Sequence, residues 1–354
     1  MTNRELLQHR LLNQQIAGSV LRTPQELVQH FGAMQSQEYA QAKWAIGLRV
    51  PHLHEQDVEA AFNEGKILRT HVLRPTWHFV APQDIRWILS VSAPRVQAFN
   101  AHMYRKTNLD TKLLNRCATI IESALSGGNF LTRNALNELL VKKKIVSDGV
   151  RLSLIMMYAE LEAIICSGPR HGKQFTYALL EERVPSTKKL SQQEALAGLA
   201  LRYFSGRSPA TIQDFAWWSG LTVKDCKTAA GLLPSSFKEK SIDGKTYIVA
   251  PAQEIEVKKD SAFLLPDYDE YGISYKDRSA IFTNDGAGEK RGGNTIFNHM
   301  LVIDGKIAGT WKRTGKNNEL AEAKPFAALS KKQEAATSRA IRHYETFMQS
   351  REKK

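Results

Sequence analysis

Along this chain the spacing of hydrophobic residues switches repeatedly from a helical period to an alternating one. Ile212, Phe215 and Ala216 recur at i, i+3 and i+4, which predicts a helix. Further along, Asp243–Gly244 lies between two alternating segments, and this dipeptide is a strong signal of a two-residue hairpin turn. The pattern predicts helices followed by a hairpin, which is the order of elements in a winged-helix motif.

The helix ends of this unit carry residues that favour helix termini. Ser208 and Pro209 are expected to be the N-cap and the first helical residue of the first helix. Gly220 allows the turn that follows, and Thr222 is expected to cap a second helix that ends near Leu232. The two helices are therefore predicted to be short and joined by a tight turn.

A second unit earlier in the chain repeats this order. Thr132 is expected to cap a helix with an apolar inward side, and another helix is predicted over 148–163. Strands predicted over 163–166 and 174–179 complete the unit as a hairpin.

A third, degenerate copy comes first in the chain. Helices are predicted over 24–31, 38–48 and 55–64, and a hairpin over 66–82. The three hairpins end alike, in TWHFVAP, FTYALL and KTYIVAP, which indicates one supersecondary unit used three times. Composition alone is the alternative explanation, because aromatic-rich strands often end in this way.

The C-terminal part of the chain follows a different pattern. Segments 261–282 and 298–313 alternate like strands, and Asp304–Gly305 is another hairpin signal. A glycine-rich segment, 284–294, lies between them, and 330–354 is predicted to be a basic amphipathic helix with a frayed end. We expect a small β-rich cap here rather than a further winged helix.

These patterns predict an α+β fold with three tandem winged-helix motifs, a small C-terminal β-barrel-like cap and a terminal helix. The length of 354 residues fits several modules better than one core. The expected boundaries are 1–85, 86–185, 186–255 and 256–354.

The charge of the chain changes the picture of its partners. Lys and Arg number 49 against 36 Asp and Glu, which gives a net charge of +13. Such a balance favours a polyanionic partner, nucleic acid first, although many soluble proteins are mildly basic.

Cysteine use and hydropathy bear on the compartment. Cys117, Cys166 and Cys226 are odd in number and far apart, so neither a zinc site nor a disulfide is expected. Residues 1–16 predict a polar amphipathic helix without the apolar segment of a signal peptide. No apolar run approaches the roughly 18 residues that span a bilayer. We expect a cytoplasmic protein.

Two glutamines before the predicted helix 38–48 form the first candidate site. Ser36 is expected to be the N-cap of that helix, which leaves Gln35 in extended backbone. Because residues i and i+2 of an extended segment point to the same side, Gln35 and Gln37 are expected to converge. The alternative is two polar residues at a solvated helix start.

The first predicted hairpin concentrates basic and aromatic residues. Basic side chains beside an aromatic ring can hold phosphates and enter a DNA groove. Alternatively, the tryptophan belongs to the core and the cations are only solvated. The candidates for DNA binding are Arg69, His71, Arg74, Trp77 and His78.

A cluster of carboxylates provides a second candidate site. One hypothesis is that Asp267, Asp269 and Glu270 act as acid and base or hold a cation. Lys276 and Arg278 follow closely and are expected to neutralise them. The structural alternative is an ion-pair network at the end of a strand.

Other signals of chemistry are weak. The segments 168–173 and 284–294 are rich in glycine, but neither ends in the Gly-Lys-Ser/Thr of a phosphate loop. We therefore predict no nucleotide cofactor, no other cofactor and no metal. No Gly-x-Ser-x-Gly elbow of a serine hydrolase is present in the sequence.

Five segments together resemble a known family. The resemblance runs from about residue 5 to about residue 350, nearly the whole chain, and the combination of the five segments is more specific than any one of them. In chain order they are MQSQEYAQAKWAIGLR, HVLRPTWHFVAP, SPATIQDFAWWSGLT, LLPDYDEYGISYKDRS and DGKIAGTWKR. The chain resembles the AlkZ/YcaQ-like winged-helix DNA glycosylases.

The resemblance implies a fold of three tandem winged helices and a small β-barrel around a basic cleft. It implies a monofunctional DNA glycosylase that hydrolyses the N-glycosidic bond of N7-alkylated purines in double-stranded DNA, interstrand crosslinks included in the AlkZ branch. The family signature is Gln-Φ-Gln with an aliphatic centre. Gln35 and Gln37 match the two glutamines as catalytic residues, whereas Ser36 departs from the central position.

With this resemblance we expect a monomer at the nucleoid that has no membrane partner. Three alternatives remain open from the residues alone. They are a non-catalytic winged-helix transcriptional regulator, an enzyme that uses the carboxylate cluster, and a scaffold whose basic face meets a protein.

Overall fold

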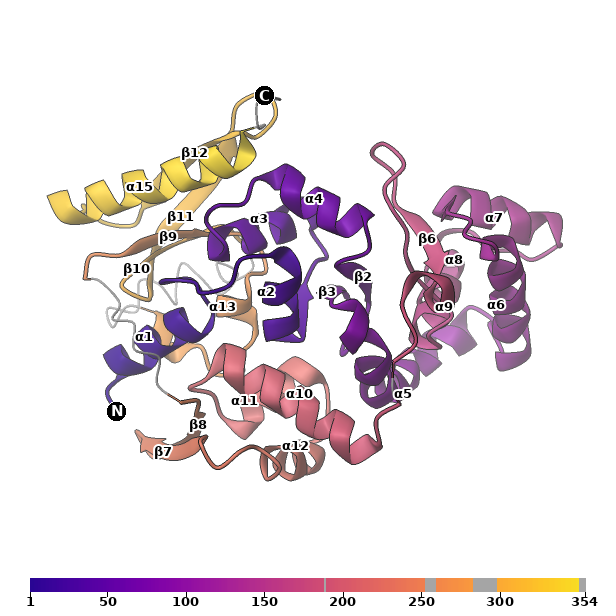
Figure 1. The fold of residues 1–354 in the computed structure, drawn as a ribbon, viewed down its shortest axis with the longest axis horizontal. Helices are drawn as coiled ribbons and strands as arrows, with labels where there is room; N and C mark the ends of the chain where they lie inside the picture. Colours follow the sequence, from indigo (N-terminus) through magenta and orange to yellow (C-terminus); the bar gives the residue numbers. More distant parts are fainter. Residues whose placement is uncertain (188, 252–258, 283–297, 350–354) are drawn as a thin grey trace.

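The computed structural model describes residues 1–187, 189–251, 259–282 and 298–349. The second helix-and-hairpin unit lies at one end of the longest axis, and the C-terminal sheet with its long helix lies at the other (Figure 1). The first unit lies between them. The glycine-rich segment 284–294 lies outside the described residues.

The first unit combines four helices with a three-stranded antiparallel sheet in the order β1-β3-β2. The predicted helices and hairpin of this unit are confirmed, and a short strand, β1, joins the hairpin. The elements are α1 (Asn3–Asn13), α2 (Pro24–Phe31), β1 (Ala33–Gln35), α3 (Tyr39–Arg49), α4 (Glu55–Asn63), β2 (Leu68–His71) and β3 (Trp77–Val80).

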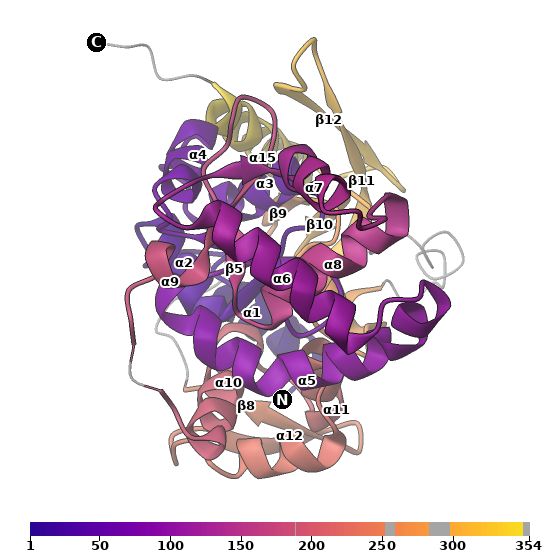
Figure 2. The same cartoon turned by 90° about the vertical axis from the view of Figure 1, so that its right-hand side faces the viewer.

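A long helix, α5 (Pro82–Lys106), leads from the first unit to the second. Thr132 caps α7 as predicted, since its side chain accepts a hydrogen bond from the Ala135 N–H. The second unit has its own small sheet, in the order β4-β6-β5. Its elements are α6 (Thr111–Leu125), β4 (Leu131–Thr132), α7 (Arg133–Lys142), α8 (Gly149–Leu161), β5 (Ile165–Ser167) and β6 (Thr176–Leu179). Figure 2 views the molecule from this side, with the third unit below.

The third unit ends in the predicted hairpin, and Asp243 and Gly244 both have the positive φ of its turn. The short helix α9 (Leu180–Arg183) still packs on the sheet of the second unit. The elements of the third unit are α10 (Gln192–Arg207), α11 (Ile212–Ser219), α12 (Val223–Ala230), β7 (Lys238–Ile242) and β8 (Lys245–Val249).

The predicted start of α11 at Ser208 is wrong. The N-cap is Thr211, whose side chain accepts from the Asp214 N–H at 3.1 Å while Asp214 accepts from the Thr211 N–H at 2.9 Å. This reciprocal capping box satisfies two helix-start donors, which a Ser-Pro start does not. Ser208 instead ends α10 and accepts a hydrogen bond from Ala250.

The C-terminal part contains an antiparallel sheet in the order β12-β11-β10-β9. The predicted β-rich cap is therefore present, but the described strands form an open sheet and not a closed barrel, because β9 and β12 are its two edges. Helix α15 packs on this sheet and on α3. The elements are β9 (Ala262–Leu265), α13 (Glu270–Ile273), η1 (Ser279–Ile281), β10 (Met300–Ile303), β11 (Lys306–Thr314), β12 (Leu320–Pro325) and α15 (Lys331–Met348).

One apolar core joins the two ends of the chain. Leu6 and Leu11 of α1 belong to the same buried cluster as Leu264 of β9 and Phe347 of α15. The first unit and the C-terminal sheet thus stabilise each other, and the site described below lies where they meet. Among the residues that the structure describes, no helix is long and apolar enough to cross a membrane.

Candidate active site

Gln35 is the last residue of β1, where it pairs with His78 of β3. The predicted extended backbone at this position is confirmed. The Gln35 side-chain carbonyl accepts a hydrogen bond from the Gln37 N–H at 2.6 Å. The Gln37 side-chain carbonyl in turn accepts from the Trp77 N–H at 3.4 Å. Both amides are therefore attached to the same short loop after β1.

The two amides differ in exposure. Gln37 is exposed and Gln35 is half-buried. Neither amide NH₂ donates a hydrogen bond to any of the described residues, so both donors are available to water or a ligand. That the two side chains converge on one point stays a prediction.

Ser36 does not cap the helix that follows, contrary to the prediction. Its N–H donates to the Trp77 carbonyl at 2.8 Å, which extends the strand pairing by one residue and buries its side chain. Helix α3 begins at Tyr39, and its N-cap Glu38 makes no side-chain capping bond. A small residue fits the central position because that position faces the interior.

Arg69 supports the loop that carries Gln35 and Gln37 through hydrogen bonds to two of its carbonyls. Its Nε donates to the Ser36 carbonyl at 3.0 Å and its Nη2 to the Gln37 carbonyl at 3.3 Å. The guanidinium lies between two rings, 4.3 Å from the centroid of Trp77 and 4.6 Å from that of Phe175. Burial lowers the pKa of Arg69 to about 10, so it stays charged at neutral pH. In this structure Arg69 is buried and supports the loop, and its predicted contact with DNA stays a prediction.

The two histidines of the hairpin are also buried. His71 pairs with Glu160 of the second unit. His78 is fully buried, and its Nδ1 lies 2.9 Å from the Thr76 carbonyl, which can only accept, so we assign the proton to Nδ1. Desolvation lowers the pKa of His78 to about 3, which keeps the ring neutral. His71 is covered where the first and second units meet, whereas His78 is buried in the central strand of the first unit's own sheet.

Two hairpin residues remain near the surface. Arg74 and Trp77 are half-buried. The Nε atom of Arg74 is itself buried and has no hydrogen-bond partner among the described residues. These two side chains remain the candidates for DNA contact among the five predicted from the hairpin.

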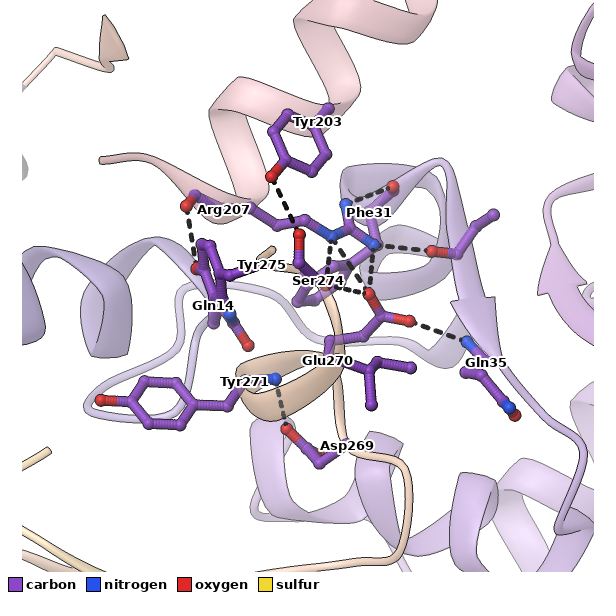
Figure 3. A network of polar contacts seen from close by, with 12 residues as sticks. Gln14, Phe31, Gln35, Tyr203, Arg207, Asp269, Glu270, Tyr271, Ser274 and Tyr275 are labelled. Carbon is purple, nitrogen blue, oxygen red and sulfur yellow. Dashed lines mark hydrogen bonds and ion pairs between the residues drawn. The ribbon is translucent and has the colours of Figure 1, made fainter. Parts of the chain in front are cut away.

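The carboxylate of Glu270 is buried and binds groups from three parts of the chain next to Gln35 (Figure 3). One oxygen accepts from the Gln35 backbone N–H at 2.8 Å, and the other accepts from Arg207 Nη2 at 2.8 Å and from the Ser274 hydroxyl. Burial alone would raise the pKa of Glu270. The Arg207 charge and the hydrogen bonds outweigh burial and lower this pKa to about 2. Glu270 is therefore a permanently ionised support of β1.

The other two carboxylates of the cluster have separate partners. Asp269 is buried and binds Arg49 through two hydrogen bonds of 2.8 Å. Asp267 is partly exposed and lies 3.0 Å from His299. The three predicted acids therefore do not share a partner, and Asp269 and Glu270 are engaged in buried ion pairs. An ion-pair network, the alternative to an acid–base or cation site, is the better description of this cluster.

Sequence reasoning named the wrong cations for these acids. The partners are Arg49, the last residue of α3, and Arg207, the last residue of α10, rather than Lys276 and Arg278. Arg207 also donates to the Phe31 and Ala33 carbonyls, which fixes the start of β1. The sequence held one local signal that could have pointed to these two arginines. Each is the last residue of its helix, where a cation complements the helix dipole.

The cysteines and the candidate metal ligands lie apart from the glutamine loop or from one another in the described part of the chain. Cys117, Cys166 and Cys226 are buried and free. No three His, Cys, Asp or Glu side chains gather there to hold a metal ion. The chemistry that the site offers consists of neutral amides on a loop with charged supports beneath it.

The comparisons with known proteins agree over most of the chain. A family model described as DNA glycosylase AlkZ-like matches residues 28–347. The chain is 21% identical over 303 residues to the Interstrand DNA cross-link repair glycosylase of Streptomyces sahachiroi, with 81% of each chain covered. The solved structure of Streptomyces sahachiroi DNA glycosylase AlkZ superposes with a TM-score of 0.79 at 18% identity. That superposition covers 98% of this chain and 96% of the other, so the folds are alike throughout.

Proposed function

This chain belongs to the AlkZ-like DNA glycosylase family, and from that membership we propose that it hydrolyses the N-glycosidic bond of N7-alkylated purines in double-stranded DNA. Its substrates include purines joined as interstrand crosslinks, the damage for which the Streptomyces sahachiroi relative is named. The three helix-and-hairpin units act as winged-helix motifs that present the site to the duplex. The enzyme works as a monomer, without a nucleotide cofactor, at the nucleoid.

The positive charge of the alkylated base explains why neutral amides, without a general acid, suffice for catalysis. Alkylation at N7 leaves the base positively charged, so it departs as a neutral group without protonation by a general acid. The enzyme then has to place a water beneath the anomeric carbon while the bond breaks. A carboxamide can orient that water, because it offers both a hydrogen-bond acceptor and a donor.

The observation that carries the proposal is the way the Gln35–Gln37 loop is held. Glu270 fixes the Gln35 peptide from one side, and Arg69 fixes the Gln37 peptide from the other. The Gln37 amide is exposed on this fixed backbone, with its NH₂ donor free among the described residues. Positioned groups of this kind lower the barrier because their ordering entropy is lost on folding and not during the reaction.

The charges near the loop suit a cationic substrate. The two amides carry no charge, so they do not repel an alkylated base. The charge of Arg207 is balanced by Glu270 and that of Arg49 by Asp269, in both cases within the protein interior. The net charge of +13 attracts the phosphate backbone as a whole.

Base release is tested with duplex DNA that carries N7-methylguanine. The protein is incubated with this duplex, abasic sites are then cleaved with alkali, and the controls are the same modified duplex without protein and an undamaged duplex of the same sequence. The first control measures the breaks that alkali and heat make at N7-methylguanine on their own. Breaks at the modified guanines well above this protein-free level are the expected result. A DNA-binding regulator would retard both duplexes in a gel and add no breaks to the protein-free level, and that outcome would sink the proposal.

A further inference from the structure

A cavity of about 350 Å³ opens beside the candidate active site, where the first and second units meet. Its walls come from the β2–β3 hairpin, from the start of α7 and from β6 with the loop before it. Of the nine described residues that line it, three are basic and none is acidic. Nothing in the proposed mechanism uses this cavity.

The cavity shares a wall with the loop that carries the glutamines. Trp77 lines it, and the Trp77 backbone N–H donates to the Gln37 side-chain carbonyl. Arg69 lines it too and donates to the Gln37 carbonyl. A group bound in the cavity would therefore lie next to the reacting nucleotide and not at a remote surface.

The lining has the chemistry of a nucleotide site. Arg133 and Lys173 offer positive charge that none of the described lining residues neutralises. The first residues of α7 lie at the same wall, where a helix start favours an anion. The rings of Phe175 and Tyr177 provide apolar surface for a sugar or base. The volume lies at the lower end of the range for small-molecule sites, which suits a group of nucleotide size.

The basic residues of the cavity have different roles. Arg69 is committed to the loop and lies between two rings, so it forms part of the wall. Arg133 is half-buried, and its only described side-chain hydrogen bond is the 2.7 Å contact from Nη2 to the Ser153 hydroxyl. Lys173 is exposed, and its ammonium has no described partner. Arg133 and Lys173 are thus the side chains available to a phosphate.

We propose that this cavity binds one nucleotide of the DNA strand, next to the nucleotide that reacts, with its phosphate held by Arg133 and Lys173. Its position beside the reacting nucleotide rests on the proposed function, whereas binding of a DNA phosphate does not. The cavity thereby fixes the register of the strand relative to the glutamines.

The test measures binding to a duplex that cannot be cleaved, one that carries a tetrahydrofuran abasic analogue. Fluorescence anisotropy gives Kd over a series of KCl concentrations. Arg133→Ala and Lys173→Ala should each reduce the slope of log Kd against log salt by about one, because each removes one phosphate contact. Kd at 0.1 M salt should rise roughly fivefold to tenfold, the effect of one contact with that salt dependence.

Two further variants separate charge from structure. Lys142→Ala removes the same charge at the opposite end of α7, where the side chain is exposed, and should leave the slope unchanged. Arg133→Lys keeps the charge and should keep the slope. A slope that stays at the wild-type value in Arg133→Ala and Lys173→Ala overturns the proposal, as does a loss in Lys142→Ala of the same size.

The result is independent of base release. If the wild-type protein makes no abasic sites but the slopes change as described, the proposed function fails and the cavity still binds DNA. If base release occurs and the slopes do not change, the proposed function stands and the cavity proposal fails.

Discussion

The carboxylate of Glu270 accepts a hydrogen bond from the backbone N–H of Gln35 at 2.8 Å, although the two residues are 235 positions apart in the chain. Glu270 belongs to the C-terminal part, and Gln35 ends a strand of the first unit. The same carboxylate binds Arg207 at the end of α10. Three distant segments therefore meet at one buried ion pair, which holds the strand that leads into the candidate catalytic loop.

Loss of the Glu270 charge should destabilise the whole protein. Glu270→Gln leaves Arg207 buried without a counter-charge, which costs about 3 to 5 kcal/mol in the free energy of unfolding. Urea unfolding followed by circular dichroism measures this. The double variant Glu270→Gln/Arg207→Met should recover part of the loss, because no unpaired charge remains. A double variant destabilised by the sum of the two single losses would contradict the coupling.

Substitution of either glutamine should slow base release without weakening DNA binding. Gln35→Ala and Gln37→Ala remove the groups proposed to orient water, a loss of about 100-fold in single-turnover rate. Kd for the uncleavable duplex should stay within about twofold, since neither amide is a cationic phosphate contact. Gln193→Ala, at an exposed position of α10, is the control and should react at the wild-type rate. Equal losses of rate and affinity would assign the glutamines to binding.

Arg69→Met tests whether this arginine supports the loop or contacts DNA. The variant keeps much of the side-chain length but removes the donors to the Ser36 and Gln37 carbonyls. Base release should fall about tenfold or more, because a displaced catalytic group slows the reaction. The salt slope of DNA binding should not change. A slope reduced by about one would show that Arg69 reaches a phosphate after all.

The stability of the protein should fall in mild acid, partly through His78. Its pKa of about 3 in the folded protein lies below its ordinary value of 6.5. Between these values the unfolded chain binds a proton that the folded protein excludes. Above about pH 6.5 His78 therefore takes nothing from the free energy of unfolding. As the pH falls from 6.5 towards 3, this group lowers the free energy of unfolding by up to about 1.4 kcal/mol per pH unit.

The variant His78→Gln isolates this contribution. The free energy of unfolding, measured by urea titration between pH 4 and pH 7, should depend less steeply on pH than in the wild type. His102→Gln replaces an exposed histidine of α5 and should keep the wild-type dependence. Parallel curves for His78→Gln and the wild type would show that His78 is not held neutral.

Asp269→Asn distinguishes an ion-pair role from acid–base catalysis. The substitution breaks the two hydrogen bonds to Arg49 and leaves a buried charge, so the free energy of unfolding should fall by about 3 to 5 kcal/mol. The rate of base release per folded molecule should stay within about twofold. Full stability with abolished activity would instead establish a carboxylate mechanism.

Much of the secondary structure could be predicted from the sequence, because its signals act over a few residues. Thr132 caps its helix through a bond to the Ala135 N–H, three positions away. Asp243 and Gly244 form their turn within a single hairpin. Where two local signals compete, the prediction failed: Ser208–Pro209 looked like a helix start, but the Thr211–Asp214 capping box begins the helix.

Side-chain roles were harder to predict because they depend on how the units pack. Arg69, His71 and His78 suggested a DNA-binding hairpin, yet all three side chains are buried. Arg69 binds the loop, His71 pairs with the second unit, and His78 lies in the central strand of its own sheet. The order β12-β11-β10-β9 depends on which strands pair, so an alternating pattern alone could not tell an open sheet from a barrel.

By itself the sequence determined the repeated helix-and-hairpin units, the basic character, and the extended Gln35 with Gln37 just beyond it, since periodicity, charge and turn chemistry are local properties. Only the tertiary structure decided that Glu270 and Arg207 anchor Gln35 and that Arg69 anchors Gln37. Those contacts span 32 to 235 positions, and the two made by Glu270 form only when the first unit, the third unit and the C-terminal part pack together, because buried charges select their partners by proximity and desolvation.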